Sequence, residues 1–432
     1  MELWLARAAR THGDRVALLG AGGEQLSYQA LDARSRSAAG ALLERGVSAG
    51  DRVALALAGN DLVVALHGCM AIGAVAVPID LRLGADERHA RTAGAVTVVS
   101  APLAGAPAPV RRELALHEIA TIMHTSGTTA APRPVALSYD NWLWNALGSA
   151  LALGLDSQER WLCPMPLAHV GGLSIQLRSA IYATTVVLHD RFDTEAALAA
   201  LMDPAQAVTL VSLVPTMLAR LLDAGLREPP TLRWALLGGG PIAPALLQAA
   251  AAAGVSVAPS YGMTETCSQI ATDGLPLLGI ELRIADDGEV LVRGANVARG
   301  ALGDDGWLHT GDLGALDRRG RLTITGRKAD TIISGGENVA PAEVEAVLLE
   351  HPAVADAAVF GIPDLEWGEA VVADVVIRAG MDADGEGLRT HCARTLAAFK
   401  VPKAIRLVSG LPRGETGKLL RRDLGKSIRQ SP

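Results

Sequence analysis

Strand-like and helical segments alternate through most of the chain, and this alternation limits the folds that it can adopt. Helical patterns at 26–46, 194–202 and 244–254 separate apolar strand-like segments at 51–57, 183–190, 207–215 and 255–262. Strands separated by helices form βαβ units, because two parallel strands need a crossover long enough to hold a helix. We therefore expect an α/β fold built on layers of largely parallel sheet.

After about residue 281 the pattern changes to short strands. Residues 281–294 predict two strands around a turn at Asp287 and Gly288, and residues 318–327 predict a third strand. The rest of the chain mixes two helices with short strands. We expect a large N-terminal domain, 1–328, that ends in a small β-rich subdomain, and a small mobile α+β C-terminal domain, 329–432.

Composition excludes several classes of protein. The chain has 432 residues, 50% hydrophobic and 20% charged, which is typical of a globular protein with more than one core. A net charge of −7 gives no basic excess for nucleic acid. Four cysteines without a CxxC pair indicate reduced thiols, and no signal peptide is visible, so we expect a cytoplasmic protein. Residues 62–79 are apolar, but His67 and Pro78 favour a buried helix–strand pair over a membrane span.

Two polar, glycine-containing segments follow strand-like segments and could bind phosphate. Thr125, Ser126, Gly127, Thr128 and Thr129 can present backbone N–H groups and hydroxyls to an anion, although a solvated turn would look the same. This loop is not a Walker loop, because GxxxxGK[ST] is absent. The second segment, 238–243, has a GxGxxA spacing, but the next strand ends in Pro259 and Ser260 without an acid for a ribose. A dinucleotide fold is therefore the weaker interpretation.

Four more segments follow in a characteristic order. They are SYGMTET at 260–266, HTGD at 309–312, GRKADTIISGGENVAPAEVE at 326–345 and LPRGETGKLLRRDL at 411–424. Together with the loop at Thr125, they resemble the acyl-adenylate-forming superfamily of acyl-CoA synthetases, luciferases and peptide-synthetase adenylation domains. The resemblance covers nearly the whole chain.

The resemblance implies a site for Mg²⁺ and ATP. The implied nucleotide-binding residues are Thr125, Ser126, Gly127, Thr128, Thr129 and Arg133 for the β- and γ-phosphates, Thr264 for the α-phosphate, Tyr261 and Gly262 beside the adenine, Gly238, Gly239 and Gly240 between the adenine and acyl pockets, and Asp312 and Arg327 for the ribose hydroxyls. Glu265 would bind Mg²⁺. A site of this kind can stabilise the charge that develops when a carboxylate displaces pyrophosphate.

The resemblance also implies a reaction in two steps. Lys418 would bridge the acyl carboxylate and the α-phosphate while acyl-AMP forms. The small domain would then rotate about Ala329 and bring Gly335 and Gly336 to a tunnel for coenzyme A. The products would be acyl-AMP and pyrophosphate, then acyl-CoA and AMP.

Three segments, at 164–178, 236–247 and 261–270, look like those of ligases that activate o-succinylbenzoate for menaquinone biosynthesis. The resemblance places His169 at the acyl pocket and the coenzyme A tunnel, as a catalytic residue together with Lys418, Thr264 and Glu265. It places Gly239 beside the acyl pocket. Because o-succinylbenzoate carries a second, unreactive carboxylate, we expect Arg178, helped by Ser174, to bind it in two parallel hydrogen bonds. The alternatives are a satisfied core histidine at 169 and a surface arginine at 178.

The phosphate loop departs from the superfamily pattern TSGTTGxPKG at Ala130, Arg133 and Pro134. Arg133 keeps the positive charge as a rigid fork, and Ala130 adds a Cβ where glycine is usual. A ligase for another aryl or medium-chain acid, a ligase that loads a carrier protein, and a non-catalytic nucleotide-binding relative are alternatives. Retention of Glu265, Asp312 and Lys418 argues against loss of catalysis. A homodimer is possible.

Overall fold

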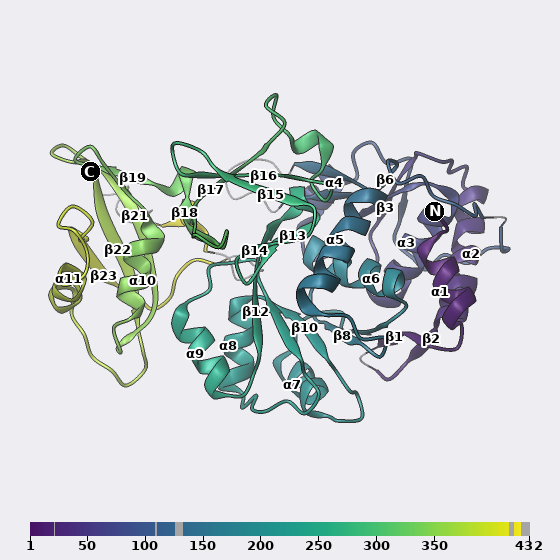
Figure 1. Ribbon diagram of the computed structural model, residues 1–432, viewed down its shortest axis with the longest axis horizontal. Helices are drawn as coiled ribbons and strands as arrows, with labels where there is room; N and C mark the ends of the chain where they lie inside the picture. The colour runs from purple at the N-terminus through teal and green to yellow at the C-terminus, as the bar shows by residue number, and fades with distance from the viewer. Residues whose placement is uncertain (21, 109, 126–132, 414–418, 425–432) are drawn as a thin grey trace.

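The computed structural model describes residues 1–20, 22–108, 110–125, 133–413 and 419–424. It confirms the expected α/β class: parallel strands alternate with helices up to about residue 263, and antiparallel sheets follow. In Figure 1 a small unit of strands and two helices lies at the opposite end of the molecule from the N-terminal helix.

The largest sheet has the strand order β14-β13-β12-β11-β10-β8-β9-β1-β2. Its central strands are parallel, and β2, β13 and β14 pair antiparallel at its two edges. The strands are β1 (Val16–Gly20), β2 (Gln25–Ser27), β8 (Arg160–Cys163), β9 (Thr185–Leu188), β10 (Leu210–Leu213), β11 (Trp234–Leu237), β12 (Val257–Met263), β13 (Ser268–Thr272) and β14 (Leu275–Pro276).

A second sheet has the order β5-β3-β4-β6-β7, parallel except for the β6–β7 hairpin. Its strands are β3 (Arg52–Leu55), β4 (Val75–Pro78), β5 (Thr97–Val99), β6 (Ile119–His124) and β7 (Pro134–Ser138). The apolar run at 62–79 forms most of helix α3 (Gly59–Ile72) and strand β4, as predicted. In the described part of the chain, no helix is both long and apolar enough to cross a membrane.

Helices cover the large sheet on both faces. Trp161 and Cys163 of β8 belong to the core that contains α6 (Val170–Tyr182), whereas Leu162 between them belongs to the core under α7, α8 and α9, because successive strand residues face opposite ways. The other helices of this part are α1 (Trp4–His12), α2 (Tyr28–Glu44), α4 (Ala85–Arg91), α5 (Tyr139–Leu153), α7 (Thr194–Met202), α8 (Pro215–Asp223) and α9 (Pro244–Ala252).

An antiparallel sheet follows, in the order β15-β16-β17-β18. Its strands are β15 (Ile280–Ile284), β16 (Glu289–Gly294), β17 (Leu308–Leu316) and β18 (Leu322–Arg327). The predicted turn at Asp287 and Gly288 joins β15 to β16, and Gly288 has a φ of 84° that suits glycine.

The last unit has its own sheet and its own apolar core, which includes Val344, Val359 and Leu388. Its elements are β19 (Ile332–Ser334), β20 (Glu337–Val339), α10 (Pro341–Leu349), β21 (Val354–Asp364), β22 (Gly368–Ile377), α11 (Gly385–Ala393) and β23 (Ala404–Leu407). Strands β21 and β22 pair along their whole length and are longer than the short strands expected. The one-turn helix Lys328–Asp330 connects this unit to β18.

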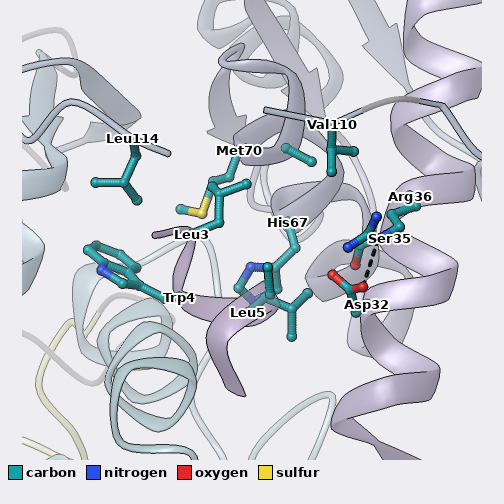
Figure 2. Close-up of a pocket in the computed structure, with 12 residues that line it drawn as sticks. Leu3, Trp4, Leu5, Asp32, Ser35, Arg36, His67, Met70, Val110 and Leu114 are labelled. Atoms are coloured by element: carbon teal, nitrogen blue, oxygen red, sulfur yellow. Dashed lines mark hydrogen bonds and ion pairs between the residues drawn. The ribbon is translucent and has the colours of Figure 1, made fainter. Parts of the chain in front are cut away.

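A recess between α1, α2 and α3 contains the buried His67 (Figure 2). Its free volume is about 20 Å³, room for about one water molecule and too small for a substrate. Arg36 and Asp32 form an ion pair on one side, and Trp4 lies on the other. Burial lowers the pKa of His67 from 6.5 to about 4, so this side chain is neutral in the folded protein at pH 7.

Burial of neutral His67 should make the protein sensitive to acid. Between pH 6.5 and 4, His67 binds a proton in the unfolded chain but not in the folded protein, so the free energy of unfolding falls as the pH drops. The full shift corresponds to about 3 kcal/mol. We expect His67→Gln to flatten the dependence of the unfolding free energy on pH across this window, measured by denaturant titration.

His117, which is exposed, provides the control. His117→Gln should leave the slope of the wild type unchanged. An equal slope in His67→Gln and the wild type would contradict the assignment of this acid sensitivity to His67.

Candidate active site

Most of the predicted site residues follow the carboxyl ends of strands. Thr125 comes directly after β6, Gly238 after β11, and Thr264 after β12. His169 is the N-cap residue of α6, in the connection that leaves β8. Ligands of open α/β sheets bind at this edge, so the fold gathers these segments where chemistry is expected.

The described ends of the phosphate loop are joined by hydrogen bonds. Thr125 N–H donates to the Arg133 carbonyl (3.0 Å), and Arg133 N–H donates to Thr125 Oγ1 (3.1 Å). The β6–β7 pairing brings these two residues together. Ser126, Gly127, Thr128, Thr129 and Ala130 lie outside the described residues, so their proposed contacts with phosphate stay predictions.

The glycines at 238–240 follow the end of β11 and pack against the neighbouring strands β10 and β12. Gly238 N–H donates to Leu213 O (3.1 Å), and a Cβ on Gly238 would lie 3.0 Å from Ser260 O. Gly239 has a φ of 79°, a conformation that L side chains rarely adopt. Gly238 and Gly239 therefore suit glycine for backbone reasons, whereas a Cβ on Gly240 would meet only Pro215, at 3.9 Å. The structure alone assigns the segment no nucleotide contact.

The turn that carries Thr264 and Glu265 is held tightly by its backbone. A Cβ on Gly262 would lie 1.6 Å from Ser268 O, so only glycine lets β12 and β13 approach here. Glu265 O accepts from Ala298 N–H (2.8 Å). In the described part of the chain, the side chains of Thr264 and Glu265 make no hydrogen bond or ion pair and are half-buried, so they can accept a ligand.

Tyr261, Asp312 and Arg327 meet, although they come from different parts of the sequence. The Tyr261 hydroxyl donates to Asp312 Oδ2 (2.8 Å), and Arg327 Nε lies 2.7 Å from Asp312 Oδ1. Asp312 is buried, and burial together with this carboxylate raises the pKa of Tyr261. The group is a buried carboxylate beside an aromatic ring and a cation.

Ala329 lies between two anchored neighbours. Lys328 Nζ contacts Asp287 Oδ2 (2.6 Å) and Glu289 Oε2 (3.0 Å), and Asp330 Oδ2 lies 2.9 Å from Arg421 Nε. Gly335 and Gly336 form the two-residue turn between β19 and β20, with φ values of 62° and 83° that suit glycine at both positions. Lys418 lies outside the described residues.

His169 contacts two residues that sequence reasoning missed. Its Nε2 lies 3.1 Å from Asp80 Oδ2 and 3.1 Å from Arg82 Nη2. Asp80 and Arg82 follow the carboxyl end of β4. Polar residues directly after an apolar parallel strand are candidates for a site, so their position in the sequence could have identified them. His169 is therefore not enclosed in an apolar core, and 26% of its side chain is exposed.

Arg178 is buried, and the alternative of a surface arginine is wrong. Only 2% of Arg178 is exposed, because α6 packs between α5 and the large sheet. Its Nη2 donates to Asn145 Oδ1 (2.5 Å), and its guanidinium lies over the Trp161 ring at 5.4 Å. Within the described residues, Nε and Nη1 have no hydrogen-bond partner.

Ser174 does not contact Arg178 by a hydrogen bond. Its hydroxyl donates to Gly171 O (3.1 Å), within the first turn of α6. Ser174 is 1% exposed, and Leu173 and Leu177 are buried beside it. Help from Ser174 in binding a carboxylate stays a prediction.

Comparisons with known proteins agree with this arrangement. The AMP-binding enzyme family matches residues 5–101 and 93–302, and the AMP-binding enzyme C-terminal domain matches residues 343–418. A 2-succinylbenzoate–CoA ligase from Bacillus licheniformis is 39% identical over 98% of each chain. The o-succinylbenzoate CoA synthetase from Bacillus subtilis in complex with the acyl-adenylate intermediate is 36% identical over 98% of each chain, with a TM-score of 0.90. The same enzyme in complex with ATP and magnesium ion is 35% identical, covers 99% of this chain and 100% of its own, and has a TM-score of 0.90.

The turn at Gly262 gives a direct test of the site's backbone. Gly262→Ala places a Cβ against Ser268 O, which should lower the free energy of unfolding by about 3 kcal/mol, the upper end for overpacking. Gly300→Ala, where a Cβ meets nothing within 4 Å, should change it by less than about 0.5 kcal/mol. Equal melting curves for the two variants would show that the β12–β13 contact is not tight.

Proposed function

The chain belongs to the AMP-binding enzyme family, and we propose that it is an ATP-dependent acid–CoA ligase whose acid is 2-succinylbenzoate. The products would be the acyl-CoA, AMP and pyrophosphate. Relatives named for this activity cover almost the whole chain, which supports the assignment.

The contact of Tyr261, Asp312 and Arg327 is the main structural observation that supports nucleotide binding. A ribose offers two hydroxyl donors, and Asp312 is a carboxylate acceptor already held from both sides. The Tyr261 ring offers a flat apolar face to an adenine. Thr125 and Arg133, at the base of the phosphate loop, and Thr264 would take the phosphates.

Glu265 fits a magnesium site. Its carboxylate has no partner in the described residues, and Mg²⁺ prefers one or two carboxylates together with phosphate oxygens. The bound ion would supply positive charge that offsets the charge on the phosphates during displacement. In the first step Thr264 and Lys418 would orient the α-phosphate, while the loop that begins at Thr125 holds the leaving pyrophosphate.

The second step needs coenzyme A, and we propose that the small unit rotates to admit it. The proposed domains are 1–328 and 329–432, with Ala329 as the hinge. The ion pairs on either side support this boundary, because Lys328 contacts β16 of the large unit and Asp330 contacts Arg421. Gly335 and Gly336 would then line the path of the thiol. A cytoplasmic location and a homodimer stay predictions from the sequence.

Arg178 is the proposed anchor for the second carboxylate of the acid. A buried guanidinium with two unpaired nitrogen atoms, Nε and Nη1, is costly, and a benzoate carboxylate can accept a hydrogen bond from either of them. Asn145 also donates to Gln269 O (3.2 Å), which connects Arg178 to the strand that follows the Thr264 turn. Burial lowers the pKa of Arg178, but arginine stays charged at pH 7.

A substrate screen tests the proposed function. We expect ATP–pyrophosphate exchange that depends on 2-succinylbenzoate, and acyl-CoA formation when coenzyme A is added. Benzoates and fatty acids should support exchange poorly. Exchange without transfer to coenzyme A would indicate a ligase that loads a carrier protein, and no exchange with any acid would refute the proposal.

Lys418→Ala should separate the two steps. Loss of a cation at the reacting phosphate should slow acyl-AMP formation by about 10²–10³-fold, measured by exchange. Thioester formation from supplied acyl-AMP should be nearly unchanged. Lys400→Ala removes an ion pair with Glu343 in the same unit and should leave both steps unaffected. Equal losses of both steps in Lys418→Ala would contradict domain alternation.

Arg178→Ala should weaken binding of the ring carboxylate specifically. We expect KM for 2-succinylbenzoate to rise by roughly 30-fold or more, because truncating one partner of a buried charge pair costs about 2–5 kcal/mol. An analogue without the ring carboxylate should be used with nearly unchanged KM. Equal losses on both acids, or no loss on either, would eliminate Arg178 as the anchor.

A further inference from the structure

Asp80 is a buried carboxylate whose hydrogen bonds converge beside the pocket histidine. It is 5% exposed and follows the carboxyl end of β4. It accepts hydrogen bonds from Arg82 Nε (2.9 Å), Arg82 Nη2 (2.6 Å) and Arg82 N–H (3.1 Å). Its Oδ2 also lies 3.1 Å from His169 Nε2.

The charge on Asp80 favours a proton on Nε2 of His169. Burial opposes ionisation of Asp80, but the hydrogen bonds from Arg82 and His169 outweigh it and hold the pKa of this carboxyl well below its usual range. An ionised carboxylate only accepts hydrogen bonds, so a hydrogen bond between the two side chains needs His169 Nε2 as the donor. Arg82 Nη2 lies equally close to Nε2, at 3.1 Å, and its second N–H could donate to Nε2 only in the other tautomer of the ring. We assign the proton to Nε2, where it forms a charge-assisted hydrogen bond with Asp80, and the lone pair of a neutral His169 ring is then on Nδ1.

Nδ1 is left available for a substrate. In the described ranges, no hydrogen bond to Nδ1 is present, and part of the His169 side chain is exposed. Arg82 balances the charge of Asp80, so the carboxylate orients the ring without leaving an isolated negative charge beside it. A histidine held by a carboxylate through one nitrogen, with the other nitrogen free, is the arrangement of a general base.

We propose that Asp80 is a positioning residue that holds His169 as the base for the thiol of coenzyme A. This inference rests on the proposed function and concerns its second step. The S–H proton passes to His169 Nδ1, and the thiolate sulfur attacks the carbonyl carbon of acyl-AMP. The carbon–oxygen bond to the phosphate then breaks, AMP leaves with the electron pair, and His169 returns its proton to water.

The test separates the two half-reactions. A positioned base contributes about 10²–10⁴-fold, so Asp80→Asn should slow thioester formation from supplied acyl-AMP by roughly 10–100-fold through loss of orientation. The variant should keep ATP–pyrophosphate exchange within about threefold of the wild type, because the first step needs no thiol base. His169→Ala should slow the same step. The double variant should be no slower than His169→Ala, because the two residues act as one unit.

Two further measurements exclude a purely structural effect. Hydroxylamine attacks acyl-AMP without a base, so hydroxamate formation should be unchanged in Asp80→Asn. Nitrogen-15 NMR of His169 should show the proton on Nε2 in the wild type and a mixture of tautomers in Asp80→Asn. Glu159→Gln is the control, because Glu159 pairs with Arg233 as Asp80 pairs with Arg82. The side chains of Glu159 and Arg233 are 2% and 35% exposed, and those of Asp80 and Arg82 are 5% and 35% exposed. Glu159→Gln should leave the ratio of the two half-reaction rates unchanged.

Each outcome is decisive. Loss of both half-reactions to the same extent, additive losses in the double variant, or a normal rate of thioester formation in Asp80→Asn would overturn the role of Asp80. These results differ from the failure of the proposed function, in which the wild type would show no acid-dependent exchange.

Discussion

The carboxylate of Asp312 joins the parts of the chain that form the candidate site. It lies on β17, accepts from Tyr261 of the large sheet and pairs with Arg327 at the end of β18. Asp312 is only 4% exposed, and Arg327 supplies the positive charge that offsets the cost of burying its carboxylate. This group therefore helps to hold the antiparallel sheet against the large sheet, together with the apolar core that Ile270 of β13 shares with Val290 of β16.

The sequence predicts local structure and backbone constraints well. Helix α7 spans residues 194–202, as the apolar periodicity indicates, and the predicted turn at Gly288 joins two strands. These features depend on neighbouring residues, so pattern and glycine placement suffice to find them. The resemblance assigned Tyr261 to the adenine and Asp312 to the ribose, but it did not predict the hydrogen bond between them, because neither residue specifies the other locally.

Contacts between distant residues could not be read from the sequence. Asp80 and His169 are 89 residues apart, and each looks like an ordinary loop or core residue by itself. The burial of Arg178 could not be predicted either. The periodicity of α6 identifies its apolar side, but whether its polar side faces water depends on which other elements pack against the helix. In this protein α5 and the large sheet cover α6, so Arg178 is a buried cation over the Trp161 ring.

The anchoring of Lys328 and Asp330 has a mechanical consequence. Lys328 is fixed to the acidic side chains of the antiparallel sheet, and Asp330 is fixed to Arg421 of the small unit. Rotation that preserves both anchors must be absorbed by the few backbone torsions between them, and Ala329 contributes two of these. The small unit would then rotate as a rigid body about a hinge of very few residues. The two extreme orientations of this unit would be limited by steric contacts at Ala329, and not by the bending of a long linker.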